Sequence, residues 1–138
     1  MTDEAETDLR IAVMRLARRL RLERAEGDLT DSQLSVLFVL WKEGPQTLRS
    51  LAEHERVTPP SMNRTVNALV EAGVAARGDA PDDGRKVVVN ATEAGIALAL
   101  ETRRRRAAWF SHQLEALDDD ERALLTAAAP LLRRLADS

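Results

Sequence analysis

The side chains with the clearest capacity for chemistry follow Thr58, in a short segment rich in small polar groups. Arginine can bind guanine and asparagine can bind adenine in two-point contacts, each worth about 1–3 kcal/mol of discrimination against the wrong base. Asn63, Arg64 and Asn67 share one face of a helix at this spacing. A solvated polar face has the same composition, so the order of the surrounding elements must decide between the two. The candidate base-reading residues are Ser61, Asn63, Arg64 and Asn67, and Thr58 and Pro60 are further candidate DNA contacts.

A second group of charged residues lies in a turn-rich segment further along the chain. Glycine, proline and aspartate recur over residues 78–84, which favours the tip of a hairpin. An arginine at such a tip can enter a narrow minor groove, while a neighbouring aspartate orients its guanidinium. Arg85 is the candidate for this contact. The further candidate DNA contacts in this region are Arg77, Asp83 and Lys86.

The 138-residue chain lacks the groups that most other chemistries need. It has no cysteine, which excludes disulfides, thiolate metal ligands and thiol catalysis. His54 and His112 are far apart, and neither stands at a spacing that places two metal ligands on one helix face. No Ser-His-Asp spacing, glycine-rich phosphate loop or carboxylate pair is recognisable. We therefore expect no catalytic residues, no metal, no cofactor and no enzyme activity.

Composition predicts one soluble globular unit, with 44% hydrophobic and 31% charged residues. No apolar run reaches the roughly 18 residues of a membrane span, and the start of the chain is acidic, unlike a signal peptide, so we expect a cytoplasmic protein.

The formal net charge is -3, and residues 45–91 hold six basic and six acidic side chains. Any DNA contact must therefore come from locally placed basic groups. The same charge balance leaves open an alternative, a protein–protein interaction module.

Helix start and stop signals recur along the chain and predict six helices and one hairpin. The first helix should end near Gly27, the second should span residues 31–42 after a Thr30–Gln33 capping box, and the third should span residues 48–54. The fourth should follow Thr58, the fifth should follow Thr92, and the sixth should follow a capping box of Asp118 and Glu121. Strands are expected over 74–77 and 85–90. Pro130 should interrupt and kink the last helix. Two short helices followed by a hairpin predict a mainly α fold with a small β-hairpin wing, a winged helix-turn-helix.

The first and last helices carry apolar stripes that the small winged lobe cannot cover. These stripes contain Leu9, Val13, Leu16, Leu20, Leu125, Leu131, Leu132 and Leu135. Burial against a second copy of the chain is the simplest resolution, so we expect a homodimer. The single unit of residues 1–138 then divides into a DNA-binding lobe at about 30–91 and a helical dimerisation lobe at about 8–27 and 92–138.

Arg103 interrupts an apolar stripe of the helix after Thr92, which is formed by Ile96, Leu100, Ala107, Phe110, Leu114 and Leu117. A guanidinium there must pair with an acid, extend to solvent or receive an anionic ligand. Trp41 and Trp109 are typical core or dimer-packing residues, although in a crevice between the lobes an aromatic ring could stack on a ligand. The candidate ligand residues are Trp41, Arg103 and Trp109. The four arginines at 103–106 point in different directions on a helix, so we expect solvated or ion-paired roles for the run as a whole.

Taken together, these residues resemble the MarR family of transcriptional regulators. The resemblance rests on Leu29-Thr30-x-x-Gln33, Leu51-Ala52-Glu53, Val57-Thr58-Pro59-Pro60-Ser61, Arg64, Leu69, Gly73-Val74, Arg77, Asp83-x-Arg85 and Thr92-x-x-Gly95. It implies a two-fold dimer formed by the N- and C-terminal helices, which binds double-stranded DNA at a pseudo-palindromic operator and is released by a small anionic or aromatic effector. A sequence-specific regulator, a repressor, is therefore expected. Pro130 in a dimerisation helix and Gly84 between the wing Asp and Arg depart from the pattern.

Overall fold

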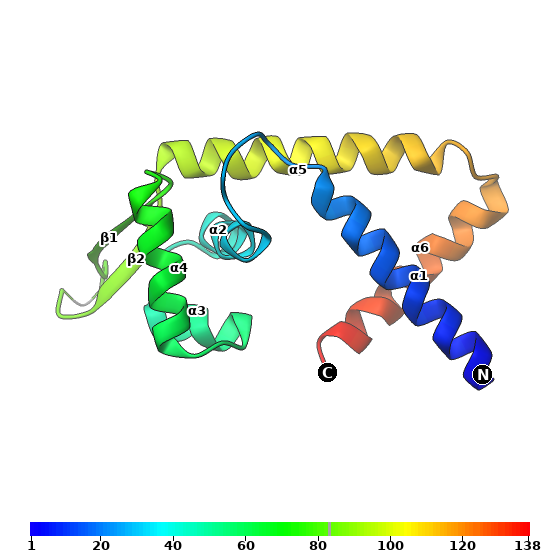
Figure 1. Cartoon of the computed structure of the whole chain (residues 1–138), viewed down its shortest axis with the longest axis horizontal. Helices are drawn as coiled ribbons and strands as arrows, with labels where there is room; N and C mark the ends of the chain where they lie inside the picture. Colours follow the sequence, from blue (N-terminus) through cyan, green and yellow to red (C-terminus); the bar gives the residue numbers. More distant parts are fainter. Residues whose placement is uncertain (83) are drawn as a thin grey trace.

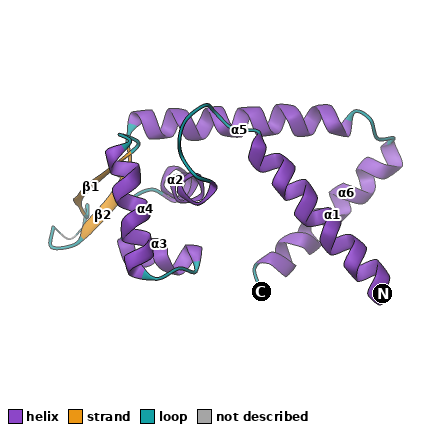
Figure 2. Ribbon diagram, viewed as in Figure 1, coloured by secondary structure: helices purple, strands orange, loops and turns teal. Residues whose placement is uncertain are grey.

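The computed structural model describes residues 1–82 and 84–138 and confirms a mainly helical chain with one hairpin (Figures 1 and 2). The helices are α1 (Asp3–Leu22), α2 (Asp31–Glu43), α3 (Leu48–Glu55), α4 (Pro59–Glu71), α5 (Glu93–Leu114) and α6 (Asp119–Ala136), and the strands are β1 (Ala75–Asp79) and β2 (Val87–Ala91). Asp83, a candidate DNA contact, lies outside the described residues. Within the described part, no helix combines the length and apolarity that membrane crossing needs.

Side-chain caps explain where the helices begin. Threonine hydroxyls at positions 2, 30, 47, 58 and 92 each accept a hydrogen bond from the backbone three residues further on. Both predicted capping boxes are confirmed, Thr30 with Gln33 and Asp118 with Glu121. The end of α1 differs from the prediction. It stops at Leu22, well before Gly27, since the connector that follows is hydrogen-bonded to α5 instead.

The hairpin is antiparallel, with Ala75 opposite Ala91 and Asp79 opposite Val87. β2 begins at Val87 and not at Arg85 as predicted, so Arg85 and Lys86 belong to the hairpin tip. Gln46 adds a short bridge on the other side of β2, where its backbone exchanges two hydrogen bonds with Val89, of 3.0 and 2.7 Å. The core lies between this hairpin and α2, α3 and α4, and its fully buried side chains include Leu37, Leu51, Met62, Val66 and Leu69.

A close contact joins the hairpin to α5. The Thr92 hydroxyl donates to the carbonyl of Gly73 at 2.7 Å and accepts from the N–H of Gly95 at 3.1 Å. Gly95 is buried against Val74, and a Cβ there would overlap the Val74 carbonyl oxygen and lie 3.0 Å from its carbonyl carbon. The Thr92-x-x-Gly95 motif therefore lets the start of α5 pack directly on the backbone that leads into β1.

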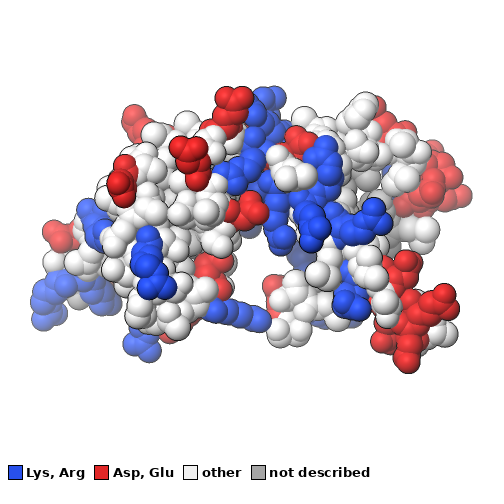
Figure 3. Space-filling model, in the orientation of Figure 1, with Lys and Arg blue, Asp and Glu red and all other residues white. Residues whose placement is uncertain are grey.

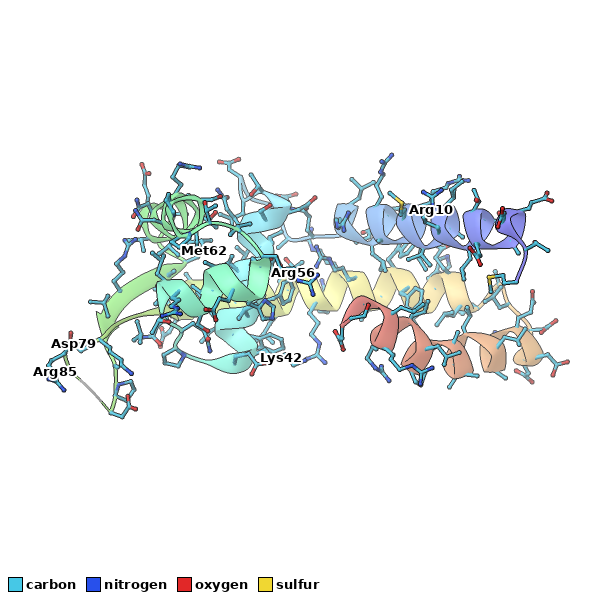
Figure 4. All side chains as sticks on the ribbon, turned by 90° about the horizontal axis from the view of Figure 1, so that it is seen from below. Arg10, Lys42, Arg56, Met62, Asp79 and Arg85 are labelled. Carbon is cyan, nitrogen blue, oxygen red and sulfur yellow. The ribbon has the colours of Figure 1, made fainter. Side chains whose placement is uncertain are left out.

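The long helix α5 connects the two parts of the molecule, with α2, α3, α4 and the hairpin (the winged lobe) at its start and α1 and α6 (the terminal helices) towards its end (Figure 1). Neither α1 nor α6 contains a buried residue. In the second view these two helices lie on opposite sides of the α5 axis (Figure 4). Contrary to the prediction, Pro130 does not interrupt α6, which continues through it. A proline in a helix removes one N–H donor, and the remaining turns are sufficient to carry the helix on.

Candidate nucleic-acid interface

Helix α4 is amphipathic because apolar and polar residues alternate at helical spacing. Thr58 caps it, and Pro59 and Pro60 occupy the first turn, where their missing N–H groups leave no bond unmade. The side chains of Met62 and Val66 are buried in the winged lobe. The opposite face is turned to solvent, so this helix can present polar groups without exposing core.

A tight turn sets α4 against α3. Arg56 ends α3 in the left-handed backbone region, with φ of 56°, and the N–H of Val57 donates to the carbonyl of Ala52 at 3.0 Å. Among the described non-glycine residues, Arg56 alone has a positive φ. The chain therefore reverses within a few residues, as the turn of a helix-turn-helix requires.

The structure divides the candidate DNA contacts of residues 58–67 into two groups. Thr58 uses its hydroxyl oxygen to accept from Ser61 N at 3.2 Å, and the Ser61 side chain is half-buried. Asn63, Arg64 and Asn67 are exposed together on the outer face of α4, and Pro60 is exposed at its start. Within residues 1–82 and 84–138 the Arg64 guanidinium makes no hydrogen bond or ion pair. Asn63, Arg64 and Asn67 are thus the side chains placed for contact with an external partner.

The candidate residues of the hairpin lie on both sides of its turn. Arg77 extends from β1 towards α4, where its Nη2 donates to the Oδ1 atoms of Asn63 and Asn67 at 3.2 and 2.7 Å. Arg85 and Lys86 are exposed in the tip, close to the backbone hydrogen bond of 2.9 Å between Ala80 N and Lys86 O. Arg85 lies with Asp79 at the far end of the hairpin in Figure 4. The two basic side chains of the tip are therefore presented away from the core.

Charge is distributed unevenly over the molecule. Acidic residues gather at the beginnings of α1 and α6, with Asp3, Glu4 and Glu6 in one first turn and Asp119, Asp120 and Glu121 in the other. Figure 3 shows acidic side chains at the end of the molecule opposite the wing and also over the upper part of the winged lobe, and basic side chains at the tip of the wing and across the middle. The winged lobe is therefore close to neutral as a whole, and a polyanion would be attracted locally by the basic side chains at the wing tip.

Two of the three candidate ligand residues meet between the winged lobe and α5. The guanidinium of Arg103 lies 5.4 Å from the ring centre of Trp41, and that of Arg106 lies 5.5 Å from the ring centre of Phe38. A cavity of about 560 Å³ is lined by Phe38, Trp41, Lys42, Arg103 and Arg106. Trp109 is elsewhere, with Arg19 stacked on it at 4.6 Å. The cavity combines aromatic surface with three cations, a composition suited to an aromatic anion.

The neighbouring arginines of α5 have structural partners. Glu101 accepts from Arg104 and Arg105, and these hydrogen bonds, above all that of Arg104, hold the pKa of its carboxyl at about 2. Arg105 and Arg106 also donate to the carbonyls of Arg24 and Glu23, at 3.1 Å each, in the connector between α1 and α2. Burial lowers the pKa of Arg106. Arg105 and Arg106 thus fasten the connector to α5, a role that no local sequence signal indicates.

The candidate dimerisation residues are exposed in the single chain. Seven of them are between 40% and 68% exposed: Leu9, Val13, Leu16, Leu125, Leu131, Leu132 and Leu135; Leu20 is half-buried. Ile11, Met14 and Leu124 are also exposed apolar residues of these two helices. The sequence pattern included Leu124 in the stripe of the last helix but did not include Ile11 or Met14. A groove of about 610 Å³ between α1 and α6 is lined by Leu9, Val13, Met14, Leu132 and Leu135 among others. The terminal helices therefore expose many apolar side chains in the single chain, and those that line the groove lie together.

Known proteins resemble this chain in sequence. A model of the MarR family matches residues 29–87. A protein of Mycobacterium bovis named as an uncharacterized HTH-type transcriptional regulator is 42% identical over 131 residues, which cover 95% of this chain and 92% of that protein.

Solved structures show the same fold over the whole chain. A MarR family protein from Bacillus stearothermophilus has a TM-score of 0.84 at 22% identity, over 98% of this chain and 94% of that one. The crystal structure of RV1404 from Mycobacterium tuberculosis has a TM-score of 0.86, also at 22% identity, over 100% of this chain and 96% of that one. The likeness therefore includes the terminal helices as well as the winged lobe.

Proposed function

This chain belongs to the MarR family of HTH-type transcriptional regulators, and from this premise we propose that it is a homodimeric repressor of a pseudo-palindromic operator, released by a small aromatic or anionic ligand. Regulators of this family bind DNA and are not enzymes, which confirms the expectation from the sequence that the chain has no catalytic role. The repressor role, the operator, the dimer and the ligand are the proposed parts.

The observation that carries the proposal is the polar outer face of α4 beside the basic wing. Asn63, Arg64 and Asn67 are exposed on a helix whose other face is buried, and such a helix can enter the major groove of DNA. Arg85 and Lys86 at the hairpin tip are then positioned for the adjacent phosphates or minor groove. The basic wing and the acidic far end of the molecule favour this orientation over the reverse.

The exposed apolar surface of α1 and α6 supports the homodimer. Exposed clusters of leucine and valine on this scale are uncommon in monomers, because each such side chain gains about 1.5–3 kcal/mol on full burial. A second copy of the chain, related by a two-fold axis, would cover both helices and place two α4 helices about one DNA turn apart. That spacing is what a palindromic operator requires.

The cavity between α5 and the winged lobe supports control by a ligand. Arg103 belongs to α5, which leads to the terminal helices, whereas Trp41 belongs to α2 of the winged lobe, so a molecule held between them contacts both helices. A ligand that binds one spacing of these parts more tightly shifts the dimer towards that spacing. If the favoured spacing does not match the operator, the ligand releases the DNA.

The test is to select duplexes bound by the full chain from random DNA and to measure their affinity for variants by fluorescence anisotropy at several salt concentrations. Arg64→Ala should change the preferred sequence. Arg85→Ala should weaken binding to all duplexes and reduce the slope of log affinity against log salt by about 0.9 for each phosphate that the variant no longer neutralises. Arg104→Ala, which removes the same charge from α5, is the matched control and should do neither.

Two results would contradict the proposed interface. One is a protein that binds no duplex while remaining folded, which would favour an interaction module. The other is an Arg85→Ala variant with the salt slope of the wild type.

A further inference from the structure

One nitrogen atom connects the wing to the outer face of α4. Nη2 of Arg77 donates to Oδ1 of Asn63 at 3.2 Å and to Oδ1 of Asn67 at 2.7 Å. Asn63 and Asn67 are four residues apart and therefore one helical turn from each other on the same face. All three side chains are exposed, so this contact lies on the surface assigned to the major groove and not in the core.

The chemistry of the guanidinium determines how both amides are turned. Arginine has five N–H donors and no acceptor, whereas asparagine has one oxygen that accepts and one NH2 group that donates. Both amides must therefore direct their oxygens to Arg77, and a charged donor strengthens each bond. The NH2 groups of Asn63 and Asn67 are left as the parts of the amides available to another molecule.

Arg77 is held firmly enough to impose this orientation. It lies in the middle of β1, opposite Val89 of β2. Val89 is itself fixed on its other side by two backbone hydrogen bonds with Gln46, of 3.0 and 2.7 Å. The strand that carries Arg77 is therefore anchored through β2 to the segment before α3, which fixes the position from which the side chain reaches Asn63 and Asn67.

We propose that Arg77 is a positioning residue that sets the hydrogen-bonding polarity of the reading helix, so that Asn63 and Asn67 meet base edges as donors. This inference rests on the proposed entry of α4 into the major groove. Donors select acceptors, which in that groove are the N7 of purines, the O6 of guanine and the O4 of thymine. The two-point contact with adenine expected from the sequence needs the oxygen and the NH2 group to face the base together. The hydrogen bonds to Arg77 disfavour that arrangement.

The first test compares the sequences selected from random DNA by the wild type and by Arg77→Met. Methionine keeps much of the side-chain length but donates no hydrogen bond, so both amides become free to turn. At the base pairs next to α4, the wild type should favour guanine and thymine over adenine, because the N7 acceptor of adenine stands beside its N6 donor. Arg77→Met should lose this bias against adenine. Arg49→Met on α3 removes a charge without touching either amide and should keep the wild-type preference.

The second test keeps Arg77 and changes the group that faces the DNA. Asn67→Asp retains an oxygen for Arg77 but replaces the outward donor by an acceptor. It should bind the best wild-type duplex at least tenfold more weakly, because loss of one specific contact to a base accounts for about tenfold and the new carboxylate is also repelled by the DNA. Replacing the contacted guanine by 7-deazaguanine, which lacks the N7 acceptor, should weaken the wild type and leave Asn67→Asp unaffected.

The outcomes separate this inference from the proposed function. A wild type that selects sequences, together with an Arg77→Met variant of identical base preference, would overturn the role of Arg77 and leave the DNA-binding proposal intact. A folded wild type that selects no sequence would overturn the proposed function and this inference with it. Thermal unfolding of each variant shows that a change in preference does not come from loss of fold.

Discussion

Thr102, in the middle of α5, accepts a hydrogen bond of 3.1 Å from the backbone N–H of Ala25, in the connector between α1 and α2. Thr102 is 0% exposed and is the one buried polar side chain among the described residues. Beside it, Arg105 and Arg106 donate to the carbonyls of Arg24 and Glu23. The connector between α1 and α2 is thus fastened to α5. Loss of these hydrogen bonds should therefore destabilise both the attachment of α1 and the winged lobe.

Thr102→Val should destabilise the protein, although the two side chains have almost the same shape. Valine removes the acceptor and leaves the N–H of Ala25 buried without a partner, which costs about 1–3 kcal/mol. Urea unfolding measures this loss. Thr126→Val, at an exposed threonine of α6, is the matched control and should change the free energy of unfolding little. Equal losses at the two positions would contradict a special role for Thr102.

Gly95→Ala should also destabilise, against the usual effect of this change in a helix. Alanine is normally favoured over glycine by about 1 kcal/mol in a helix interior. At position 95 the new Cβ would overlap the Val74 carbonyl oxygen, so either α5 or the hairpin must move. We expect a net loss of about 1–3 kcal/mol in thermal or urea unfolding. Gly78→Ala, where a Cβ meets nothing within 4 Å, is the control. If Gly95→Ala increased the free energy of unfolding, the start of α5 would not be packed tightly against Val74.

Val13→Glu should convert the protein from dimer to monomer. Val13 is 42% exposed in the single chain, and its burial in a dimer interface would leave an introduced carboxylate without solvent. Light scattering after gel filtration measures the mass directly. Val57→Glu is matched in exposure, at 42%, but lies in the turn between α3 and α4. The dimer proposal fails if Val13→Glu retains the mass of the wild type, or if that mass is already a monomer's.

The ion pair of Glu101 predicts a specific dependence of stability on pH. Hydrogen bonds from Arg104 and Arg105 lower the pKa of Glu101 from 4.5 to about 2 in the folded protein. Because the folded pKa is depressed, the contribution of the carboxylate is complete above about pH 4.5 and is lost as the pH falls towards 2. The difference in unfolding free energy between the wild type and Glu101→Gln should be small, because the pair is exposed, and should shrink over this interval. A difference that widens on acidification would assign the effect to another group.

Ligand binding in the cavity should depend on Trp41 and Arg103 but not on Trp109. Benzoate, a simple aromatic anion, should quench tryptophan fluorescence in the wild type and in Trp109→Phe. The quenching should be absent in Trp41→Phe and should need higher benzoate concentrations in Arg103→Ala, since that variant lacks one cation of the cavity. Quenching that persists in Trp41→Phe and disappears in Trp109→Phe would move the site to the neighbourhood of Arg19.

Local features of the sequence predicted the start of each helix from α2 to α6 because capping acts over three or four residues. Thr30, Thr58, Thr92 and Asp118 were all recognisable as caps, and the order of the elements they begin was enough to predict a winged helix-turn-helix. The sequence also predicted which side chains of α4 are buried and which are exposed. Periodicity separated its buried face, with Met62 and Val66, from its polar face.

Periodicity failed on α5. The predicted stripe contains Ile96 and Leu100, which are 38% and 45% exposed, whereas the buried positions are Gly95, Ala99 and Thr102. Close packing against the hairpin and the connector selects small side chains there, and small side chains leave a weak hydrophobic pattern. The end of α1 was misplaced for a related reason, since Ala25 bonds to a residue far along the chain.

The sequence by itself therefore determined the fold class, most helix starts and the identity of the groups that can meet DNA, because these depend on neighbours along the chain. Only the tertiary structure decided which of those groups act together. It placed Arg77 on the amide oxygens of Asn63 and Asn67, brought Arg103 over Trp41 while leaving Trp109 apart, and bound the connector to Thr102. Each of these contacts joins residues on different elements, and their direction depends on how whole helices and strands pack.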